Sequence, residues 1–350
     1  MNDVLTEVTT WIDRGDKVAL ATVVGYQRSA PRPPGSKMAV SSRGEVAGSV
    51  SGGCVEGAVV EISDGVLRGE QPRLLHFGIP DSDAWDVGLP CGGEIDVWIQ
   101  AYDRGRFAEL AREGKRAAEV TLLEGARPGS KLLIEVGGER SGTLGAPEFD
   151  AEAVRIASEL MWSGTSERRG PFFIDVVAPP PRLVAFGAVD VAAALCKLAR
   201  AAGWRCYVVD PRARFATPER FPDAEEVIAA WPEEAFARLG GIDPATSIAV
   251  LTHDPKLDDA ALQLALRSPA RFIGAMGSRR AQAARRERLL AAGFTDDELT
   301  RLSAPLGLDL GASGREETAL SILAEVVAAR HGRGGGRLRD AQGRIHEVAA

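Results

Sequence analysis

The 350-residue sequence lacks the features that mark several common protein classes. Its 4 cysteines are too few for a disulfide-based scaffold and are typical of a reducing compartment. It has no run of about 18 or more apolar residues, so we expect no membrane span. The N-terminal residues through Lys17 lack the basic segment and apolar core of a signal peptide. These absences predict a cytoplasmic protein.

An excess of positive charge is also missing. Lys and Arg number 42 against 49 Asp and Glu, which gives a formal net charge of −7. An acidic chain of this kind is not expected to have nucleic acid or an anionic membrane surface as its main partner. The apolar fraction of 45% and charged fraction of 26% are typical of a globular protein, and the length predicts two or three domains.

Consecutive prolines at 179–181 mark the clearest linker in the chain, because they favour an extended segment that is neither helix nor sheet. Over residues of about 104–176 we expect strands, turns and one helix at about 151–162. The predicted organisation is an N-terminal domain at 1–103, an intermediate α+β region at 104–177, a linker at 178–181, a C-terminal domain at 182–331 and a disordered tail at 332–350.

Strands and helices alternate in the C-terminal half. We expect strands at 183–187, 206–210, 248–251 and 272–275, with long alanine-rich helices between them. This alternation predicts a Rossmann-like parallel sheet with helices on both faces. The N-terminal half mixes both element types without that regularity, so the predicted fold class is α/β with a mixed N-terminal domain.

The first turn of this C-terminal domain partly matches a dinucleotide-binding fingerprint. Gly187 and Ala192 meet its outer requirements, and Asp210 ends the second strand, where a ribose-binding acid belongs. Val189 replaces the middle glycine, and Asp190 places a carboxylate at the helix N-terminus, where a phosphate would bind. The pattern supports the fold, and it leaves open whether NAD(P) binds.

Two cysteines lie beside paired glycines. Cys54 follows Gly52–Gly53 at the start of a predicted helix, where backbone amides and the helix dipole favour a thiolate. Cys91 precedes Gly92–Gly93, in a loop whose glycines allow a ligand close to the backbone. Neither cysteine belongs to a C-x-x-C motif, so a zinc site is not indicated.

The alternative is that these cysteines are small buried hydrophobic residues. We expect this role for Cys196 and Cys206, which lie in an apolar helix and an apolar strand. For Cys54 and Cys91 both interpretations stay open.

Further candidates follow the later strands of the parallel sheet, at the edge where such sheets bind ligands. His253–Asp254 offers a titratable side chain there, or an ordinary loop with a helix cap. Gly274 and Gly277 lead to Ser278–Arg279, which suits an anion site or simply begins a solvated basic helix.

Taken together, the motifs resemble the XdhC/CoxI family. The resemblance lies in SGGCVE at 51–56, CGG at 91–93, the proline linker, FIGAMGSRR at 272–280 and PLGLDLG at 305–311 with the helix that follows it. It covers about residues 10–100 and 180–330. Each motif alone is weak evidence for the family, whereas the complete set in this order is specific for it.

Members of this family are accessory proteins for molybdenum hydroxylases such as xanthine dehydrogenase and carbon monoxide dehydrogenase. The resemblance implies a cytoplasmic chaperone that binds molybdenum cofactor (molybdopterin) and protects it while a cysteine desulfurase supplies the sulfido ligand. It also implies delivery of the cofactor to an apo molybdenum hydroxylase, and a homodimer. On this basis a non-catalytic role is favoured over an enzyme.

The resemblance also implies roles for single residues. Cys54 and Cys91 would contact the metal or carry sulfur, for which a soft thiolate is suited, and Ser278 and Arg279 would hold the pterin phosphate. The complete set of candidate cofactor-binding residues is Gly52, Gly53, Cys54, Glu56, Cys91, Gly92, Gly93, Gly187, Asp210, His253, Asp254, Gly274, Gly277, Ser278, Arg279 and Asp309.

The sequence departs from the family at one place. The first Rossmann turn of the family usually reads Gly-Ala-Gly-His, whereas here Val189 and Asp190 follow Gly187 and Ala188. A divergent paralogue with another client is therefore an alternative. Two other classes also stay open: an NAD(P)-dependent oxidoreductase that uses Asp210 and His253, and a docking protein without a small ligand.

Overall fold

A computed structural model describes residues 4–27, 32–78, 93–102 and 104–341. The chain divides into two units, one ending at Pro179 (unit 1) and the other beginning at Pro180 (unit 2). Each unit has its own sheets and its own apolar core. Cys91 and Gly92, two of the predicted site residues, lie outside the described residues.

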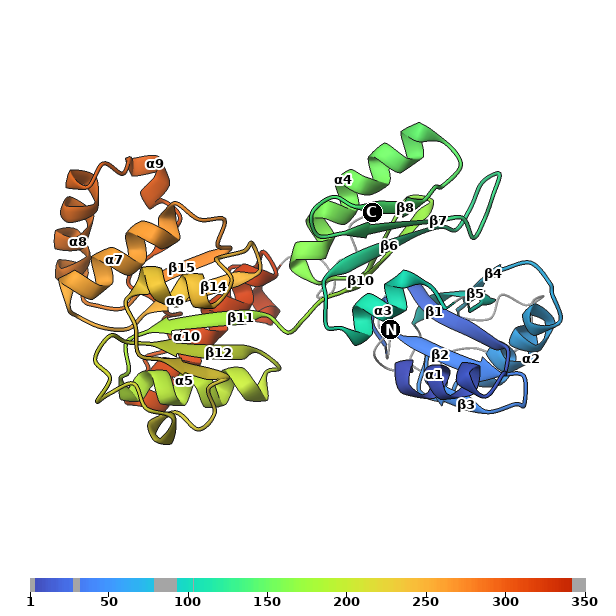
Figure 1. The fold of residues 1–350 in the computed structure, drawn as a ribbon, viewed down its shortest axis with the longest axis horizontal. Coiled ribbons are helices and arrows are strands. Elements are labelled where there is room, and N and C mark those ends of the chain that lie inside the picture. Colours follow the sequence, from blue (N-terminus) through green and yellow to red (C-terminus); the bar gives the residue numbers. More distant parts are fainter. Residues whose placement is uncertain (1–3, 28–31, 79–92, 103, 342–350) are drawn as a thin grey trace. The chain divides into compact units, whose positions relative to one another are not determined.

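The first sheet of unit 1, sheet A, is antiparallel with the strand order β3-β2-β1-β5-β4 (Figure 1). The elements of this part are α1 (Leu5–Asp13), β1 (Val18–Gln27), β2 (Lys37–Ser41), β3 (Val46–Gly48), α2 (Glu56–Leu67), β4 (Arg73–Phe77) and β5 (Glu94–Ala101). Because neighbouring strands are antiparallel, β4 ends where β5 begins, and Phe77 pairs with Ile95 there. Gly48, at the end of β3, lies level with Ile99 toward the other end of β5.

The second sheet of unit 1, sheet B, is also antiparallel, with the order β8-β7-β6-β10-β9. The elements of the part of unit 1 that contains sheet B are α3 (Arg106–Arg112), β6 (Ala117–Leu122), β7 (Lys131–Glu135), β8 (Arg140–Gly142), α4 (Pro147–Ser163), β9 (Glu167–Arg169) and β10 (Phe172–Val177). The apolar side chains of α4, among them Ile156 and Leu160, pack against this sheet.

The expectation of a single helix in this region was wrong, because the structure contains both α3 and α4. At 7 residues, α3 is too short for a helical period to stand out, although it buries Phe107 and Leu110. The longer helix begins at Pro147, a residue that fits the first helical turn, and ends at Gly164 in a left-handed conformation with φ 70°.

A buried ion pair joins the two sheets of unit 1. The ammonium Nζ of Lys37 on β2 lies 2.5 Å from Oδ2 of Asp175 on β10, and the two residues are only 2% and 8% exposed. Ser166 donates to the other carboxylate oxygen at 3.2 Å. Burial alone would raise the pKa of Asp175, but the charge and hydrogen bond of Lys37, together with Ser166, hold it below its ordinary value.

Asp175→Asn should therefore destabilise unit 1 by about 3–5 kcal/mol, because it leaves the Lys37 ammonium buried without its counter-charge. Because the folded-state pKa of Asp175 is lowered, its stabilisation is complete above the ordinary value of about 3.9 and is lost as the pH falls through the folded value. The Asn variant should lack this acid-dependent loss. Amide hydrogen exchange of β2 and β10 measures both effects.

The matched control for this pair is Lys37→Met combined with Asp175→Leu, which removes both charges and keeps the volume. It should lose much less stability than Asp175→Asn alone. A loss below about 1 kcal/mol for Asp175→Asn would show that the pair does not hold the two sheets together.

Unit 2 is built on one parallel sheet, sheet C, with the order β13-β12-β11-β14-β15-β16 (Figure 1). The strands are β11 (Arg182–Phe186), β12 (Arg205–Val209), β13 (Glu226–Ile228), β14 (Thr246–Val250), β15 (Phe272–Ala275) and β16 (Leu302–Ser303). The helices are α5 (Asp190–Ala201), α6 (Pro232–Arg238), α7 (Pro255–Leu266), α8 (Arg279–Ala291), α9 (Asp296–Leu299) and α10 (Arg315–Arg330), with 3-10 turns at Pro218–Arg220 and Leu338–Asp340.

Helices cover both faces of sheet C. Along β11, Leu183 and Ala185 pack with α5 and α10 on one face, while Val184 and Phe186 pack with α6, α7 and α8 on the other. Both faces are apolar, as a parallel sheet requires. The predicted Rossmann-like architecture is confirmed. The strand order reverses direction at β11, so the crevice beside the carboxyl ends of β11 and β14 is the usual ligand position.

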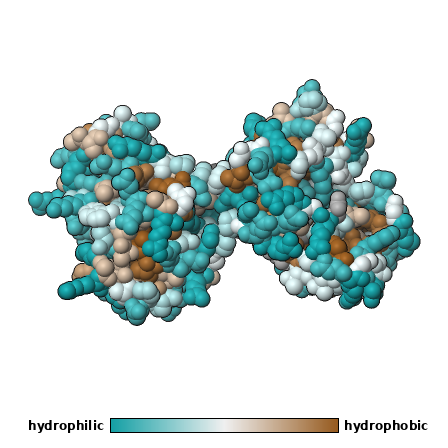
Figure 2. All heavy atoms as spheres, in the orientation of Figure 1, coloured by the Kyte–Doolittle hydropathy of each residue, from teal (hydrophilic) through white to brown (hydrophobic). Residues whose placement is uncertain are grey.

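The surface seen in Figure 2 is mainly hydrophilic, with scattered hydrophobic areas. Such scatter is ordinary for a folded domain. None of the helices in the described ranges combines the length and hydropathy that a membrane span needs.

Candidate functional site

The loop before α2 is folded around the carboxylate of Glu56. Oε1 accepts hydrogen bonds from the Ser49 hydroxyl at 2.7 Å and from the amides of Ser51 and Gly52 at 2.9 and 3.0 Å. Oε2 accepts from the Ser51 hydroxyl at 2.5 Å and from the Gly53 amide at 2.8 Å. Both glycines have positive φ, 83° and 124°, which only glycine adopts readily.

These bonds keep Glu56 ionised. Burial alone would raise the pKa of this carboxyl, but the hydroxyls of Ser51 and Ser49 and the loop amides lower it to about 2. The N-terminus of a helix, with amides turned toward one point, normally attracts an external anion. Here the carboxylate of the first helical residue occupies that position.

Cys54 lies on this loop with an exposed, reduced thiol, and its amide donates to the Ser51 hydroxyl at 3.0 Å. We expected the loop amides to stabilise a Cys54 thiolate, whereas the structure shows that they bind Glu56. Glu56 therefore faces its own loop and holds Gly52, Gly53 and Cys54 in place. A contact between Cys54 and a cofactor stays a prediction.

The end of sheet A where β4 ends and β5 begins carries a polar cluster that was not predicted from the sequence. The ring Nδ1 of His76, on β4, lies 2.8 Å from Asp96, which is also bound by Arg168 at 3.0 Å. The Nε2 atom lies 3.8 Å from Glu94, the residue after Gly93. In the part of the chain that the structure describes, no three His, Cys, Asp or Glu residues are arranged to hold a metal ion.

In unit 2, the first Rossmann turn needs a glycine for steric reasons. Gly187 follows β11 with φ 115°, and a Cβ at this position would lie 2.3 Å from the methyl group of Thr252. The turn after β11 is thus in contact with Thr252, two residues after the end of β14. This contact places both segments at the switch point of the sheet.

Asp210, after β12, is completely buried and makes four hydrogen bonds. Its Oδ2 accepts from the Ala188 amide at 2.8 Å and from Nη2 of Arg212 at 2.7 Å, while Oδ1 accepts from the amide and Nε of Arg212, both at 2.9 Å. Burial alone would raise the pKa of Asp210, but these bonds lower it below its usual value. Both oxygens are used within the protein, which does not favour the ribose-binding role considered for Asp210.

Asp190 supports the same conclusion. It is the first residue of α5, its side chain is 72% exposed, and Oδ1 lies 3.5 Å from Nη2 of Arg220. A carboxylate therefore stands at the helix N-terminus, where a dinucleotide would place its pyrophosphate. The geometry of this turn does not favour a bound NAD(P).

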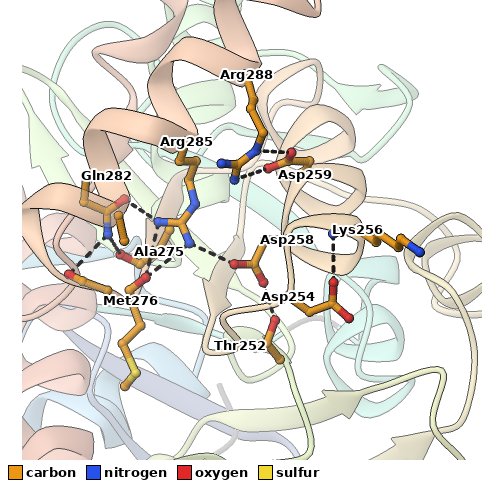
Figure 3. A network of polar contacts seen from close by, with 12 residues as sticks. Thr252, Asp254, Lys256, Asp258, Asp259, Ala275, Met276, Gln282, Arg285 and Arg288 are labelled. Carbon is orange, nitrogen blue, oxygen red and sulfur yellow. Dashed lines mark hydrogen bonds and ion pairs between the residues drawn. The ribbon is translucent and has the colours of Figure 1, made fainter.

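A buried network fixes the loops after β14 and β15 (Figure 3). Asp258 accepts a hydrogen bond from the hydroxyl of Thr252 and forms a 2.8 Å ion pair with Arg285. Both Nη atoms of Arg285 donate to the carbonyl of Met276 at 3.2 Å. Burial raises the pKa of Asp258 above its ordinary value, even though Thr252 and Arg285 oppose that shift. The network connects the segment before His253 to the turn that begins α8.

The predicted residues of these two loops lie around that network. His253 is exposed, and Asp254 caps α7 by accepting from the Lys256 amide at 3.0 Å. Ser278 caps α8, with the exposed Arg279 next to it. Gly277 before them has φ 135°.

Two further predicted positions belong to the edge beyond β15. Gly274 lies within β15, where a Cβ would be 2.3 Å from Leu306 and the loop after β16 could not approach. Asp309 is exposed in that loop. The loop is held by Glu325 of α10, which accepts from the Gly307 amide at 2.6 Å.

The structure thus brings the candidates into two groups. In unit 1, Gly52, Gly53, Cys54 and Glu56 lie together at the start of α2. In unit 2 the candidates gather along the carboxyl edge of sheet C. Five residues at this edge were not predicted from the sequence: Arg212, Phe215, Arg220, Asp258 and Arg285. The position of Arg212, two residues after Asp210, was a signal that could have been used.

The fold and these loops define a two-unit α/β protein with a thiol-bearing antiparallel unit and a Rossmann unit. A family model described as the XdhC Rossmann domain matches residues 183–326, and one described as the XdhC and CoxI family matches residues 11–78. Together they match more than half of the chain. The chain belongs to the XdhC and CoxI family, as its motifs predicted.

Relatives extend this similarity over nearly the whole chain. A Bacillus subtilis protein, named as a probable subunit of xanthine dehydrogenase, is 28% identical over 94% of this chain and 98% of its own length. The Escherichia coli molybdenum cofactor insertion chaperone PaoD is 27% identical over 90% of this chain and 84% of its own. A crystal structure of a xanthine dehydrogenase protein from Bacillus halodurans has a TM-score of 0.64, 25% identity and coverage of 97% and 98%.

Glu56→Gln tests whether this carboxylate shapes the Cys54 loop. The amide NH₂ of glutamine would face backbone donors, so at least one bond is lost and the loop should open. Hydrogen exchange of the 50–55 amides should accelerate at least about tenfold, the effect of losing roughly one charge-assisted hydrogen bond.

In the unchanged protein, Glu56 has a lowered pKa, so the protection should persist well below pH 4.5 and be lost only toward about pH 2. The control is Glu61→Gln in the same helix, which should leave exchange of the loop unchanged. Equal exchange in the Glu56→Gln variant and the unchanged protein would contradict this role of Glu56.

Proposed function

We propose that this protein is a maturation factor for a molybdenum hydroxylase, which binds molybdenum cofactor as cargo, supports its sulfuration and inserts it into the apo-enzyme. The observation that carries the proposal is the exposed thiol of Cys54 on a loop fixed by Glu56. Membership of the XdhC and CoxI family supports it, as does similarity to a protein named a molybdenum cofactor insertion chaperone.

The chemistry of the exposed groups suits this cargo. A cysteine thiolate is a soft ligand that can bind molybdenum or carry sulfur. At the edge of sheet C, the Ser278 hydroxyl and the Arg279 guanidinium offer donors to a phosphate. The loops in both units are held by internal hydrogen bonds, so they need little reordering when cargo binds.

The proposed activity is binding and release, which requires no catalytic turnover by this chain. An apo molybdenum hydroxylase as recipient, a cysteine desulfurase as sulfur donor, a homodimer and a cytoplasmic location are parts of the proposal that stay predictions. Similarity to a protein named as a probable subunit of xanthine dehydrogenase supports a hydroxylase of that type as recipient.

Molybdenum and pterin content is the test of the proposed cargo. The protein should be purified anaerobically from a host that makes the cofactor, beside Cys54→Ser, Cys91→Ser and the double variant. We expect near-stoichiometric molybdenum in the unchanged protein and a loss of at least about tenfold in Cys54→Ser, because a hydroxyl is a much weaker ligand for a soft metal.

Cys196→Ala is the matched control, since it removes a thiol that is completely buried in unit 2. Its molybdenum content should equal that of the unchanged protein. Full content in all cysteine variants would exclude the thiols from cargo binding, and no molybdenum in any of the samples would favour a docking protein without a small ligand.

An NAD(P)-dependent oxidoreductase is the competing class, and a thermal titration separates the two. A ligand at a hundredfold excess over its Kd stabilises a protein by about 2.7 kcal/mol. Because Asp210 is saturated by internal bonds and Asp190 occupies the phosphate position, we expect that NAD does not raise the melting temperature. A saturable rise with NAD would contradict this expectation.

A further inference from the structure

An exposed aromatic ring contacts two arginines in the loop after β12. Phe215 is 47% exposed although its chain neighbour Ala216 is buried. The guanidinium carbon of Arg212 lies 4.8 Å from the ring centroid, and that of Arg220 lies 5.7 Å from it. We call Arg212, Phe215 and Arg220 the cation–aromatic cluster.

Asp210 fixes the first arginine of this cluster. Two parallel bonds, from Nε at 2.9 Å and from Nη2 at 2.7 Å, hold the guanidinium plane against the buried carboxylate. The Arg212 side chain is nevertheless 47% exposed. A guanidinium has five N–H donors, so three remain outside the ion pair. At the end of β12, the group presented to solvent is therefore a cation with donors, whereas a ribose-binding acid would present an acceptor.

Arg220 fixes the rest of the cluster. Its Nη1 donates to the carbonyls of Ala188 at 3.1 Å and Phe215 at 2.9 Å, which ties the loop to the first Rossmann turn. The carboxylates near the cluster include the buried Asp210, Asp190 beside Arg220, and Asp254, whose charge also acts on Arg212. Further carboxylates line the pocket that Arg220 borders: Asp223, Glu316 and Glu317. The cluster is thus rigid and lies at the carboxyl edge of sheet C.

We infer that the cation–aromatic cluster is a binding site for a planar heteroaromatic ligand that carries an anionic group. A ring stacked on Phe215 or on an arginine plane gains dispersion and cation–π energy, and the free donors of Arg212 form charge-assisted hydrogen bonds with the anion. Neither a neutral ring nor a bare anion would use both parts of the site.

Two classes of compound combine a planar heteroaromatic ring with an anionic group: the pterin of the proposed cargo and a purine mononucleotide. The choice of a pterin rests on the proposed function, whereas the existence of the site is inferred from the cation–aromatic cluster alone. The probes are pterin-6-carboxylate, neutral 6-hydroxymethylpterin, AMP and inorganic phosphate, each titrated into the full chain by calorimetry.

We expect pterin-6-carboxylate to bind at least about tenfold more tightly than 6-hydroxymethylpterin or phosphate, because a charge-assisted bond or a stacking contact is worth roughly that factor. Phe215→Leu and Arg212→Gln should each weaken binding by at least about tenfold. Arg212→Gln removes the ion-pair partner of the buried Asp210 and can lower the stability of the protein. Phe215→Leu removes only an exposed ring, so we expect this variant to keep its melting temperature. Arg214→Gln, an exposed arginine of the same loop, is the matched control and should bind within about twofold of the unchanged protein.

Tight binding of AMP in place of the pterin, lost in the same two variants, would support the site and assign it to a nucleotide. Unchanged affinity in Phe215→Leu and Arg212→Gln, or no binding of either anionic ring by the unchanged protein, would overturn the inference. Those results would not decide the proposed function, because the molybdenum content that tests it is measured without these probes.

Discussion

Carboxylates that face the loops of both candidate regions need hydrogen-bond donors, and this requirement determines the shape of those loops. An ionised carboxylate removed from water is costly unless the protein supplies its partners. Glu56 takes them from the loop with Cys54, Asp210 from the first Rossmann turn and Arg212, Asp258 from Thr252 and Arg285, and Glu325 from the loop after β16. In each case the carboxylate holds a loop in one conformation without any ligand.

As a consequence, the groups that remain available to a ligand differ in part from the site residues predicted from the sequence. The carboxylates of Glu56 and Asp210 accept hydrogen bonds within the protein. The groups that face solvent are the thiol of Cys54, the donors of Ser278 and Arg279, and the guanidinium of Arg212. A thiolate in unit 1 is suited to a soft metal, and the cationic donors in unit 2 are suited to an anion. They are poorly suited to the ribose diol of a dinucleotide.

The sequence predicted the architecture well, because local patterns determine it. Apolar strands such as β11 alternate with amphipathic helices, and strand ends in a parallel sheet must share one edge, so the candidates of unit 2 were placed there correctly. Contacts between distant residues were not predictable: Lys37 and Asp175 are 138 positions apart, and nothing local indicates that they pair. The direction in which Glu56 and Asp210 point also depends on the folded loop, and this is why both were first considered as ligands.

The most direct test of the account is transfer of cofactor to a recipient. The protein, loaded anaerobically with molybdenum cofactor, is mixed with an apo molybdenum hydroxylase in the presence of a scavenger that destroys free cofactor, and hydroxylase activity is followed over time. We expect activation by the loaded protein, and little activation by Cys54→Ser treated with cofactor in the same way or by the same amount of free cofactor. Equal activation by free cofactor, or none by the loaded protein, would contradict it.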